Sequence, residues 1–235
     1  MVDYTSAFEK PFTDIKKLII GILFSILPII NWFAVGFILE CSGVGKTKPS
    51  KKMPEWKNFG NLFIKGFFNF LISIIYFLPA IIIFIVGVGS LMVQLLTLLS
   101  LEDISNAATD EAKMALISPI IDNLRPLLIN AIPFIIFSTL LFLVAIYVIP
   151  IAVLSYLQEN NFSGAFKFKR IFKKAFTGKY FVAWILMAFI GILFSIILGL
   201  IPYVGSAIYS FIIGVISFSL FGQVYLETEI QKKKK

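Results

Sequence analysis

Histidine is absent from this 235-residue chain, and cysteine occurs only once, at Cys41. Without histidine the chain lacks the commonest metal ligand and the commonest general base. A single cysteine cannot form an internal disulfide. Charge is also scarce, because only 14% of the residues are charged whereas soluble domains carry about 25%. From these absences we predict no catalytic, no cofactor-binding and no metal-binding residue.

Apolar residues are abundant instead, at 59% of the chain with a mean hydropathy of +0.94. They gather in long runs, and about 20 consecutive apolar residues cross a bilayer as a helix. A membrane segment must satisfy its own backbone hydrogen bonds, and unbroken apolar runs do so as helices rather than as alternating β-strands. The sequence therefore predicts an all-α, polytopic integral membrane helical bundle of five or six membrane helices, with one or two amphipathic interfacial helices.

Apolar runs alternate with charged connections within one expected membrane domain, residues 1–235. Short loops rich in Lys and Arg stay on the cytoplasmic side, which places the basic connections and the C-terminus inside and the acidic loop outside. The expected parts are an interfacial segment (1–17), a span or re-entrant hairpin (18–40), a basic cytoplasmic loop (41–65), a span (66–98), an acidic external loop (99–126), a span (127–157), a basic amphipathic cytoplasmic helix (158–180), a helical hairpin (181–226) and a basic cytoplasmic tail (227–235).

The orientation of the first apolar run depends on a short repeat. IGILFSI occurs at 20–26 and again at 190–196, and a proline follows each copy, Pro28 in the first and Pro202 in the second. If the repeat is real, the first copy forms a hairpin and the N-terminus is cytoplasmic. If an Ile-, Leu- and Phe-rich chain has repeated itself by chance, the run spans once and the N-terminus is external. We favour the cytoplasmic N-terminus.

Five prolines lie in or beside the apolar runs, where we expect them to kink helices. Proline removes a helical hydrogen bond, and neighbouring helices absorb the freed carbonyl in a membrane. A tyrosine precedes two of these prolines by three residues, so its hydroxyl could lie beside the kink; an ordinary packing position is the alternative. The predicted kinks are at Pro28, Pro79, Pro133, Pro150 and Pro202.

The basic segment 158–180 is amphipathic when residues 165–176 are placed on a helix. One face is rich in phenylalanine and the other is basic, which is typical of a helix that lies in the membrane interface. A basic linker that packs against its own helices is the alternative. The residues predicted to contact anionic lipid are Lys167, Lys169, Arg170, Lys173 and Lys174.

The stretch SGVGKT at 42–47 is similar to a phosphate-binding loop, which needs G-x-x-x-x-G-K-[ST] between a strand and a helix. Glu40 occupies the position of the first glycine, and its charge would repel a phosphate. An apolar membrane run precedes the loop, and Pro49 follows it. We therefore reject nucleotide binding at residues 43–47, from Gly43 to Thr47. The segment is better interpreted as the cytoplasmic exit of the first membrane segment.

Two stretches carry a resemblance to a known family, MPEWKNFGNLFIKGF at 53–67 and IIYFLPA at 74–80. With a third group of residues they make the chain resemble domain of unknown function 4013 over nearly its whole length. The resemblance implies a multi-pass protein of a prokaryotic cell membrane, foremost archaeal, and brings no activity and no catalytic residues. Residues 150–226 are also distantly similar to the membrane domain of glycerophosphodiester phosphodiesterases. The third group is Pro150, Ala152, Tyr156, Phe162, Ala165 and Phe166.

The leading functional prediction is a non-enzymatic membrane protein that organises the membrane or binds partners. The lipid bilayer and its anionic headgroups are the expected partners, with a protein partner or a second copy of the chain left open. Lysines beside membrane segments account for the net charge of +8, so we expect neither nucleic acid nor nucleotide. A small-molecule or lipid transporter is the alternative, and an integral membrane enzyme is the third hypothesis.

Overall fold

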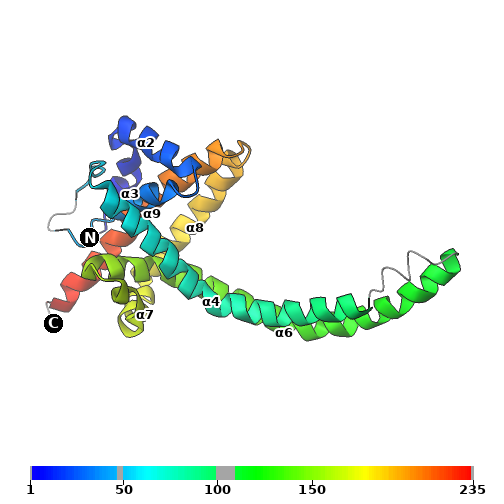
Figure 1. Ribbon diagram of the computed structural model, residues 1–235. Coiled ribbons are helices and arrows are strands. Elements are labelled where there is room, and N and C mark those ends of the chain that lie inside the picture. The colour runs from blue at the N-terminus through cyan, green and yellow to red at the C-terminus, as the bar shows by residue number, and fades with distance from the viewer. Residues whose placement is uncertain (1, 47–49, 99–108, 234–235) are drawn as a thin grey trace. The chain divides into compact units, whose positions relative to one another are not determined.

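Every regular element in the described part of the chain is a helix, as the computed structural model in Figure 1 shows. The structure describes residues 2–46, 50–98 and 109–233. In chain order the elements are α1 (Tyr4–Glu9), the 3₁₀ helix η1 (Lys10–Thr13), α2 (Ile15–Ile26), α3 (Asn31–Cys41), α4 (Phe59–Leu98), α6 (Asp110–Glu159), the 3₁₀ helix η2 (Phe162–Phe166), α7 (Phe168–Ala175), α8 (Gly178–Leu198) and α9 (Val204–Lys233).

Four helical segments among the described residues are long and apolar enough to cross a membrane. They are Phe59–Val93 of α4, Pro126–Glu159 of α6, Gly178–Leu198 of α8 and Val204–Thr228 of α9. These segments confirm the all-α, polytopic membrane fold. α2 and α3 are shorter, with 12 and 11 residues, or about 18 and 17 Å of helix. The hydrocarbon core of a bilayer is about 30 Å thick, so neither of them can cross it alone.

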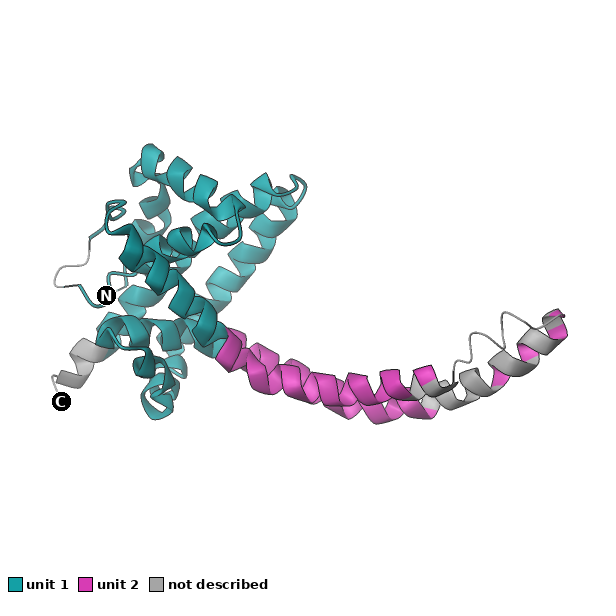
Figure 2. Ribbon diagram, in the orientation of Figure 1, with its two compact units in different colours: residues 1–73, 147–235 teal, residues 74–146 magenta. Residues whose placement is uncertain are grey.

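The chain divides into two compact units, which Figure 2 draws in teal and magenta. Unit 1 contains residues 1–73 and 147–235, and unit 2 contains residues 74–146. The two longest helices, α4 and α6, therefore each contribute part of their length to unit 1 and the rest to unit 2.

Polar side chains determine where two helices of unit 1 begin. Asp14 Oδ1 accepts a hydrogen bond from the N–H of Lys17 at 3.2 Å at the start of α2. Thr177 Oγ1 accepts from the N–H of Tyr180 at 3.4 Å at the start of α8. Such caps satisfy amide groups that have no partner within the first helical turn. Each helix therefore begins at its capping residue and not at the first residue of the apolar run.

Two helical hairpins make up much of unit 1. α2 and α3 form the first, and α8 and α9 form the second, longer one. The first hairpin returns to the end of unit 1 at which it starts, because Lys10 Nζ, just before α2, donates to Cys41 O at the end of α3 at 2.7 Å. This is the geometry that the hairpin alternative for residues 18–40 requires.

The predicted proline kinks fall into two groups. Pro79 lies inside α4, and Pro133 and Pro150 lie inside α6, so both helices continue through these residues. The bends expected there stay predictions. Pro28 and Pro202 instead lie in the turns between two helices, where the chain reverses direction. At these two positions the proline accompanies a helix break, since no helical hydrogen bond is needed in the turn.

α9 is the centre of unit 1 and packs against α1, α2, α3 and α8. Half of its most apolar 18-residue stretch is buried inside the protein, against 17% for the corresponding stretch in each of the other three segments. Close approach depends on small residues, because a Cβ added to Gly222 of α9 would lie 2.1 Å from the carbonyl oxygen of Ser42. Van der Waals packing of this kind drives helix association in membranes. The buried core includes Phe37, Leu39, Ile151, Tyr180, Phe211 and Leu220.

The loop between α3 and α4 is packed into unit 1 through Trp56. Its ring stacks on Phe37 of α3, with centroids 4.0 Å apart and planes inclined by 13°. Its Nε1–H donates to the carbonyl oxygen of Lys17 in α2 at 3.3 Å. The segment expected as a basic connection is therefore fixed to both helices of the first hairpin.

Unit 2 consists of the remaining lengths of α4 and α6. Phe77 and Phe142 stack with their ring centroids 4.6 Å apart. Many large apolar side chains of this unit are exposed, as expected of helices whose solvent is lipid. The acidic segment expected as a loop at 99–126 is helical from Asp110 on, where α6 begins, and residues 99–108 lie outside the described residues. A helix ends at a cap or a turn, and not where the apolar run ends.

Candidate functional site

The charged segments of unit 1 gather at one end of it. The backbone N–H of Asp3 donates to Gln223 Oε1 of α9 at 2.6 Å, and Lys51 Nζ lies 2.8 Å from the Asp3 carboxylate. Lys179 at the start of α8 pairs with Glu227 near the end of α9 at 2.6 Å. The N-terminal segment, the basic loop and the C-terminal part of α9 therefore lie together, where Figure 1 marks both termini. These are segments predicted to be cytoplasmic, and the side of the membrane stays a prediction.

The segment 158–180 is not one helix. After α6 the chain turns at Asn160, whose φ is 49°, and then forms η2 and α7 before α8 begins. α7 has eight residues and packs against unit 1 through Ile171 and Ala175, which are fully buried. The amphipathic helix expected here is therefore short, and its inner face is covered by protein.

Three of the five basic residues predicted to contact lipid are engaged within the protein. Lys167 Nζ and Arg170 Nη1 each lie 2.7 Å from an oxygen of Glu159. Lys174 is buried, and its Nζ lies 3.2 Å from the centroid of the Tyr225 ring and 3.2 Å from the Tyr225 carbonyl oxygen. These contacts compete with headgroups for the three cations. Helical periodicity identified the faces of α7 but not the face that the rest of unit 1 covers.

Lys169 and Lys173 remain exposed, and neither forms an ion pair with a described residue. Beside them runs a row of three phenylalanines that are 52%, 39% and 68% exposed. Neighbouring rings in the row stack with centroids 6.4 and 5.9 Å apart. Adjacent apolar and basic rows suit acyl chains and headgroups respectively. The α7 surface consists of Phe168, Lys169, Phe172, Lys173 and Phe176.

Two tyrosine hydroxyls connect α6 with the helices that follow it. The Tyr147 hydroxyl donates to the carbonyl oxygen of Ala175 at 2.6 Å, and the Tyr180 hydroxyl donates to the carbonyl oxygen of Tyr147 at 2.7 Å. The first bond joins α6 to the end of α7, and the second joins α8 to α6. The Tyr147 hydroxyl therefore donates to a neighbouring helix and not to a carbonyl of its own helix near Pro150.

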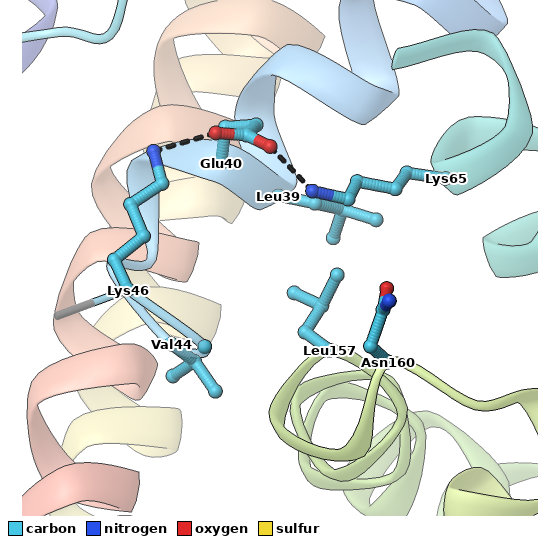
Figure 3. Close-up of a pocket in the computed structure, with 8 residues that line it drawn as sticks. Leu39, Glu40, Val44, Lys46, Lys65, Leu157 and Asn160 are labelled. Atoms are coloured by element: carbon cyan, nitrogen blue, oxygen red, sulfur yellow. Dashed lines mark hydrogen bonds and ion pairs between the residues drawn. The ribbon is translucent and has the colours of Figure 1, made fainter. Parts of the chain in front are cut away.

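A cavity of about 380 Å³ opens beside the loop that follows α3, as the close-up in Figure 3 shows. Glu40 is held between two lysines, with Lys46 Nζ at 2.6 Å from one carboxylate oxygen and Lys65 Nζ on the other. Nowhere among the described residues do three Cys, Asp or Glu side chains gather as a metal site requires. The rest of the lining consists of Leu39, Val44, Gly45, Leu157 and Asn160.

The two lysines control the ionisation of Glu40. Burial opposes ionisation, but the hydrogen bonds and charges of Lys46 and Lys65 outweigh it, and the pKa of Glu40 lies below its ordinary value of 4.5. The carboxylate is therefore ionised at neutral pH, and the cluster is an ion-paired triad.

The SGVGKT stretch has a definite place in this triad. Lys46, at the lysine position of the phosphate-loop pattern, binds Glu40, at the position of the first glycine. The helix α3 precedes the loop, where the pattern needs a strand, and Thr47 lies outside the described residues. Glu40, which departs from the phosphate-loop pattern, is thus the ion-pair partner of Lys46, which matches it.

The burial of Lys10 was not predicted from the sequence. Lys10 is 6% exposed, and its Nζ donates to the carbonyl oxygens of Cys41 at 2.7 Å and Ser50 at 2.8 Å. Burial lowers the pKa of this amine. Periodicity places Lys10 and the exposed Lys16 on the same polar face, so no signal in the sequence separates them.

The family of the chain follows from a match that covers most of its length. The profile of the family described as "Protein of unknown function (DUF4013)" matches residues 19–203. The chain belongs to this family. The DUF4013 match begins within α2 and ends in the turn before α9, so it includes the cavity lining and α7.

No curated protein and no solved structure is significantly similar to the DUF4013 chain. The expected distant similarity to the membrane domain of glycerophosphodiester phosphodiesterases is not among these findings.

Proposed function

We propose that this DUF4013 protein is a non-enzymatic membrane protein that organises anionic lipid through the α7 surface. The exposed phenylalanine row carries the proposal. Apolar surface in water costs about 25 cal/mol per Å², whereas rings at the membrane interface lie among acyl chains. Lys169 and Lys173 would then lie at the level of the headgroups, where each contributes about 1 kcal/mol near an anionic leaflet.

The attachment of α7 to unit 1 supports this role. Its inner face is held by the buried side chains of Ile171 and Lys174 and by the bond from Tyr147 to Ala175. A surface that is ordered before it binds loses less conformational entropy on binding. The α7 surface would therefore bind lipid without first having to fold.

The transporter alternative has less support from unit 2. A groove of about 290 Å³ there is lined by Ala80, Ile81 and Phe84 of α4 and by Ser138, Thr139 and Phe142 of α6. Both hydroxyls in it donate to the carbonyl oxygen of Ile135 in their own helix, at 2.9 and 2.7 Å. The polar groups of this groove are thus satisfied locally, as in helix packing, and do not form a polar path.

The proposal is tested on the full-length protein in nanodiscs that contain anionic and zwitterionic lipid. Substituting both Lys169→Gln and Lys173→Gln should lower the enrichment of anionic lipid around the protein by about fivefold for each lysine. The matched control is Lys52→Gln with Lys57→Gln, which makes the same charge change on two exposed loop lysines. Equal enrichment in both double variants would remove the lipid-organising role.

The depth of the phenylalanine row gives a second measurement. A nitroxide attached at Phe172→Cys should collide with oxygen dissolved in the acyl region and be shielded from a water-soluble relaxation agent. A nitroxide at Lys52→Cys in the basic loop is the control and should show the reverse. A Phe172 label that is open to the water-soluble agent would show that the α7 surface faces solvent, and would contradict the proposal.

A further inference from the structure

The triad cavity, which is lined by Glu40, Lys46 and Lys65, lies in unit 1 at the ends of three apolar runs. The first run ends at Leu39, directly before Glu40, the second begins after Lys65, and the third ends at Leu157. These ends belong to α3, α4 and α6, which are far apart in the sequence. A cavity at this level would face the boundary between acyl chains and headgroups, because apolar runs end where the hydrocarbon core ends.

The polar wall of the cavity carries one net positive charge. Lys46 and Lys65 contribute two positive charges and Glu40 one negative charge, which leaves +1. Each ammonium group has three N–H donors, and within the described chain each is paired only with Glu40. Donors on both lysines therefore remain for a ligand.

The backbone is shaped to bring these groups to one cavity. Gly45 has a φ of 76°, and a Cβ there would lie 2.7 Å from the carbonyl oxygen of Leu157. A larger residue would push the loop, and with it Lys46, away from α6. Asn160 has a φ of 49°, which turns the chain after α6 so that its amide lines the cavity opposite the lysines in Figure 3. Asparagine adopts this left-handed backbone region more readily than most other residues and often ends a helix in it, so this turn is a normal end for α6 that also brings the Asn160 amide to the cavity.

Part of the cavity lining is apolar. Leu39, Val44 and Leu157 are buried, with at most 8% of each exposed, and their side chains border the same cavity as the charged groups. The volume of about 380 Å³ falls in the range of small-ligand sites. A ligand that fits this lining has a compact anionic group joined to an apolar part.

We propose that the triad cavity binds a singly charged phosphodiester, the chemistry of an anionic lipid headgroup. One negative charge on the ligand balances the net charge of the wall, lysine is a common point-charge partner of phosphate, and the Asn160 amide can donate a further hydrogen bond. Basic pockets between membrane helices bind phosphate headgroups elsewhere. The cavity shares no residue with the α7 surface, so this proposal does not depend on the lipid-organising role.

The test uses the full-length protein in detergent, with dissociation constants measured by native mass spectrometry. The probes are phosphatidylglycerol, phosphatidylcholine as the zwitterionic comparison, and water-soluble glycerophosphoglycerol as a competitor. The variants are Glu40→Gln, Lys46→Gln and Lys65→Gln. Lys52→Gln and Glu9→Gln are matched controls, because both residues are exposed and make the same charge changes outside the cavity.

The affinity for phosphatidylglycerol should change in opposite directions when Glu40 is substituted and when either lysine is substituted. Glu40→Gln raises the net charge of the wall to +2 and should tighten phosphatidylglycerol binding about fivefold, while either lysine change lowers it to zero and should weaken binding about fivefold. The double variant Glu40→Gln with Lys46→Gln returns the charge to +1 and should restore the wild-type affinity, which also serves if Glu40→Gln alone folds poorly. Competition by glycerophosphoglycerol would identify a soluble phosphodiester as a ligand, and binding of the lipid alone would identify a membrane lipid.

A purely structural triad would give a different pattern. Glu40→Gln and Lys46→Gln would then fail to move the affinity in opposite directions, whatever their effect on the melting temperature, and that outcome overturns the proposal. The double variant Lys169→Gln with Lys173→Gln removes the charge of the α7 surface and so separates the two sites. If that variant abolished phosphatidylglycerol binding while the cavity variants had no effect, the cavity would be excluded and the role of the α7 surface retained.

Discussion

The two helical hairpins of unit 1 follow one plan at two lengths. The first helix of each contains IGILFSI, at 20–26 in α2 and at 190–196 in α8. Each of these helices starts at a side-chain cap, Asp14 or Thr177, and each hairpin reverses at a turn that contains proline. The hairpins therefore repeat a local structure as well as a short sequence.

Each hairpin is also closed by a buried lysine from the short helical segment before it. Lys10 reaches the carbonyl oxygen of Cys41 at the end of α3 at 2.7 Å. Lys174 reaches the carbonyl oxygen of Tyr225 towards the end of α9 at 3.2 Å. The two lysines are 6% and 8% exposed. The correspondence between the hairpins thus includes a long-range contact that no local sequence pattern encodes.

Length separates the two hairpins. α2 and α3 have 12 and 11 residues, whereas α8 and α9 have 21 and 30. At about 1.5 Å per residue only the second pair can cross a hydrocarbon core of about 30 Å. A side-chain cap, the IGILFSI motif and a proline turn therefore occur both in a hairpin that can cross the membrane and in one that cannot.

The largest expected difference lies between the two turns. Cysteines introduced as Leu27→Cys and Tyr203→Cys, at positions 52% and 83% exposed, test where each turn ends. In sealed, oriented vesicles, a membrane-impermeant maleimide should label Tyr203→Cys from the face opposite the termini. Leu27→Cys should stay unlabelled from either face, because the short hairpin would end within the bilayer.

The native thiol provides the background control for this labelling. Burial raises the pKa of Cys41 to about 12, so its thiol stays protonated and should not react. Labelling of Leu27→Cys from the same face as Tyr203→Cys would show that the first apolar run crosses the membrane once.

Removing the lysine of the short hairpin should have the larger effect on stability. Lys10→Met removes two hydrogen bonds from a charged donor, one to the buried carbonyl oxygen of Cys41 and one to that of Ser50, which should lower the free energy of unfolding by about 3 kcal/mol. Unfolding in mixed micelles measures the change. Lys16→Met, at an exposed lysine in the same region, is the control and should be neutral. Equal stabilities of the two variants would show that Lys10 does not close the hairpin.

The corresponding change in the long hairpin should cost less. Lys174→Met removes a cation–π contact and one hydrogen bond at Tyr225, worth about 2 kcal/mol together. The same unfolding measurement applies, with the exposed Lys173→Met as the matched control. A loss larger than that of Lys10→Met would reverse the order in which the two closures stabilise unit 1.

The smallest effect should come from the ion pair at the end of the short hairpin. Lys46 and Lys65 hold the pKa of Glu40 below its ordinary value of 4.5, so their stabilising contribution is fully present above that pH. It is lost as the pH falls through the lowered pKa. Melting temperatures of wild type and Glu40→Gln should therefore converge on acidification, while Glu9→Gln should follow the wild type throughout. A constant difference between wild type and Glu40→Gln would remove the ion pair as its cause.

Local sequence signals predicted the helices and turns well. The apolar runs predict an all-α membrane fold, and four membrane-length helices among the described residues confirm it. Pro28 and Pro202 lie at the two hairpin turns. The helix ends were predicted less well, because α4 begins at Phe59, well before the apolar run that identified it. Polar residues continue a helix until a cap or turn ends it, so hydropathy alone places the ends too far inside.

The candidate site was predicted only in part. Lys169 and Lys173 lie at the surface, as a lipid contact requires, whereas Lys174 is buried against Tyr225. A helical wheel of α7 treats these lysines alike, because it contains no information on Tyr225, 51 residues further along the chain, which covers one of them. In the sequence Glu40 stands out only as a departure from the phosphate-loop pattern, and no pattern assigns a role to its partner Lys65.

The sequence by itself determined the solvent of this protein and the order of its helices. Both follow from short-range physics, since runs of apolar side chains require lipid and caps and prolines delimit helices. Only the tertiary structure decided which charges remain exposed and which pair. Lys10, Glu40 and Lys174 each bind a residue that is distant in the sequence. The partners are Cys41 for Lys10, Lys65 for Glu40 and Tyr225 for Lys174. Burial of a charge depends on what packs over it, and that is a property of the assembled helices.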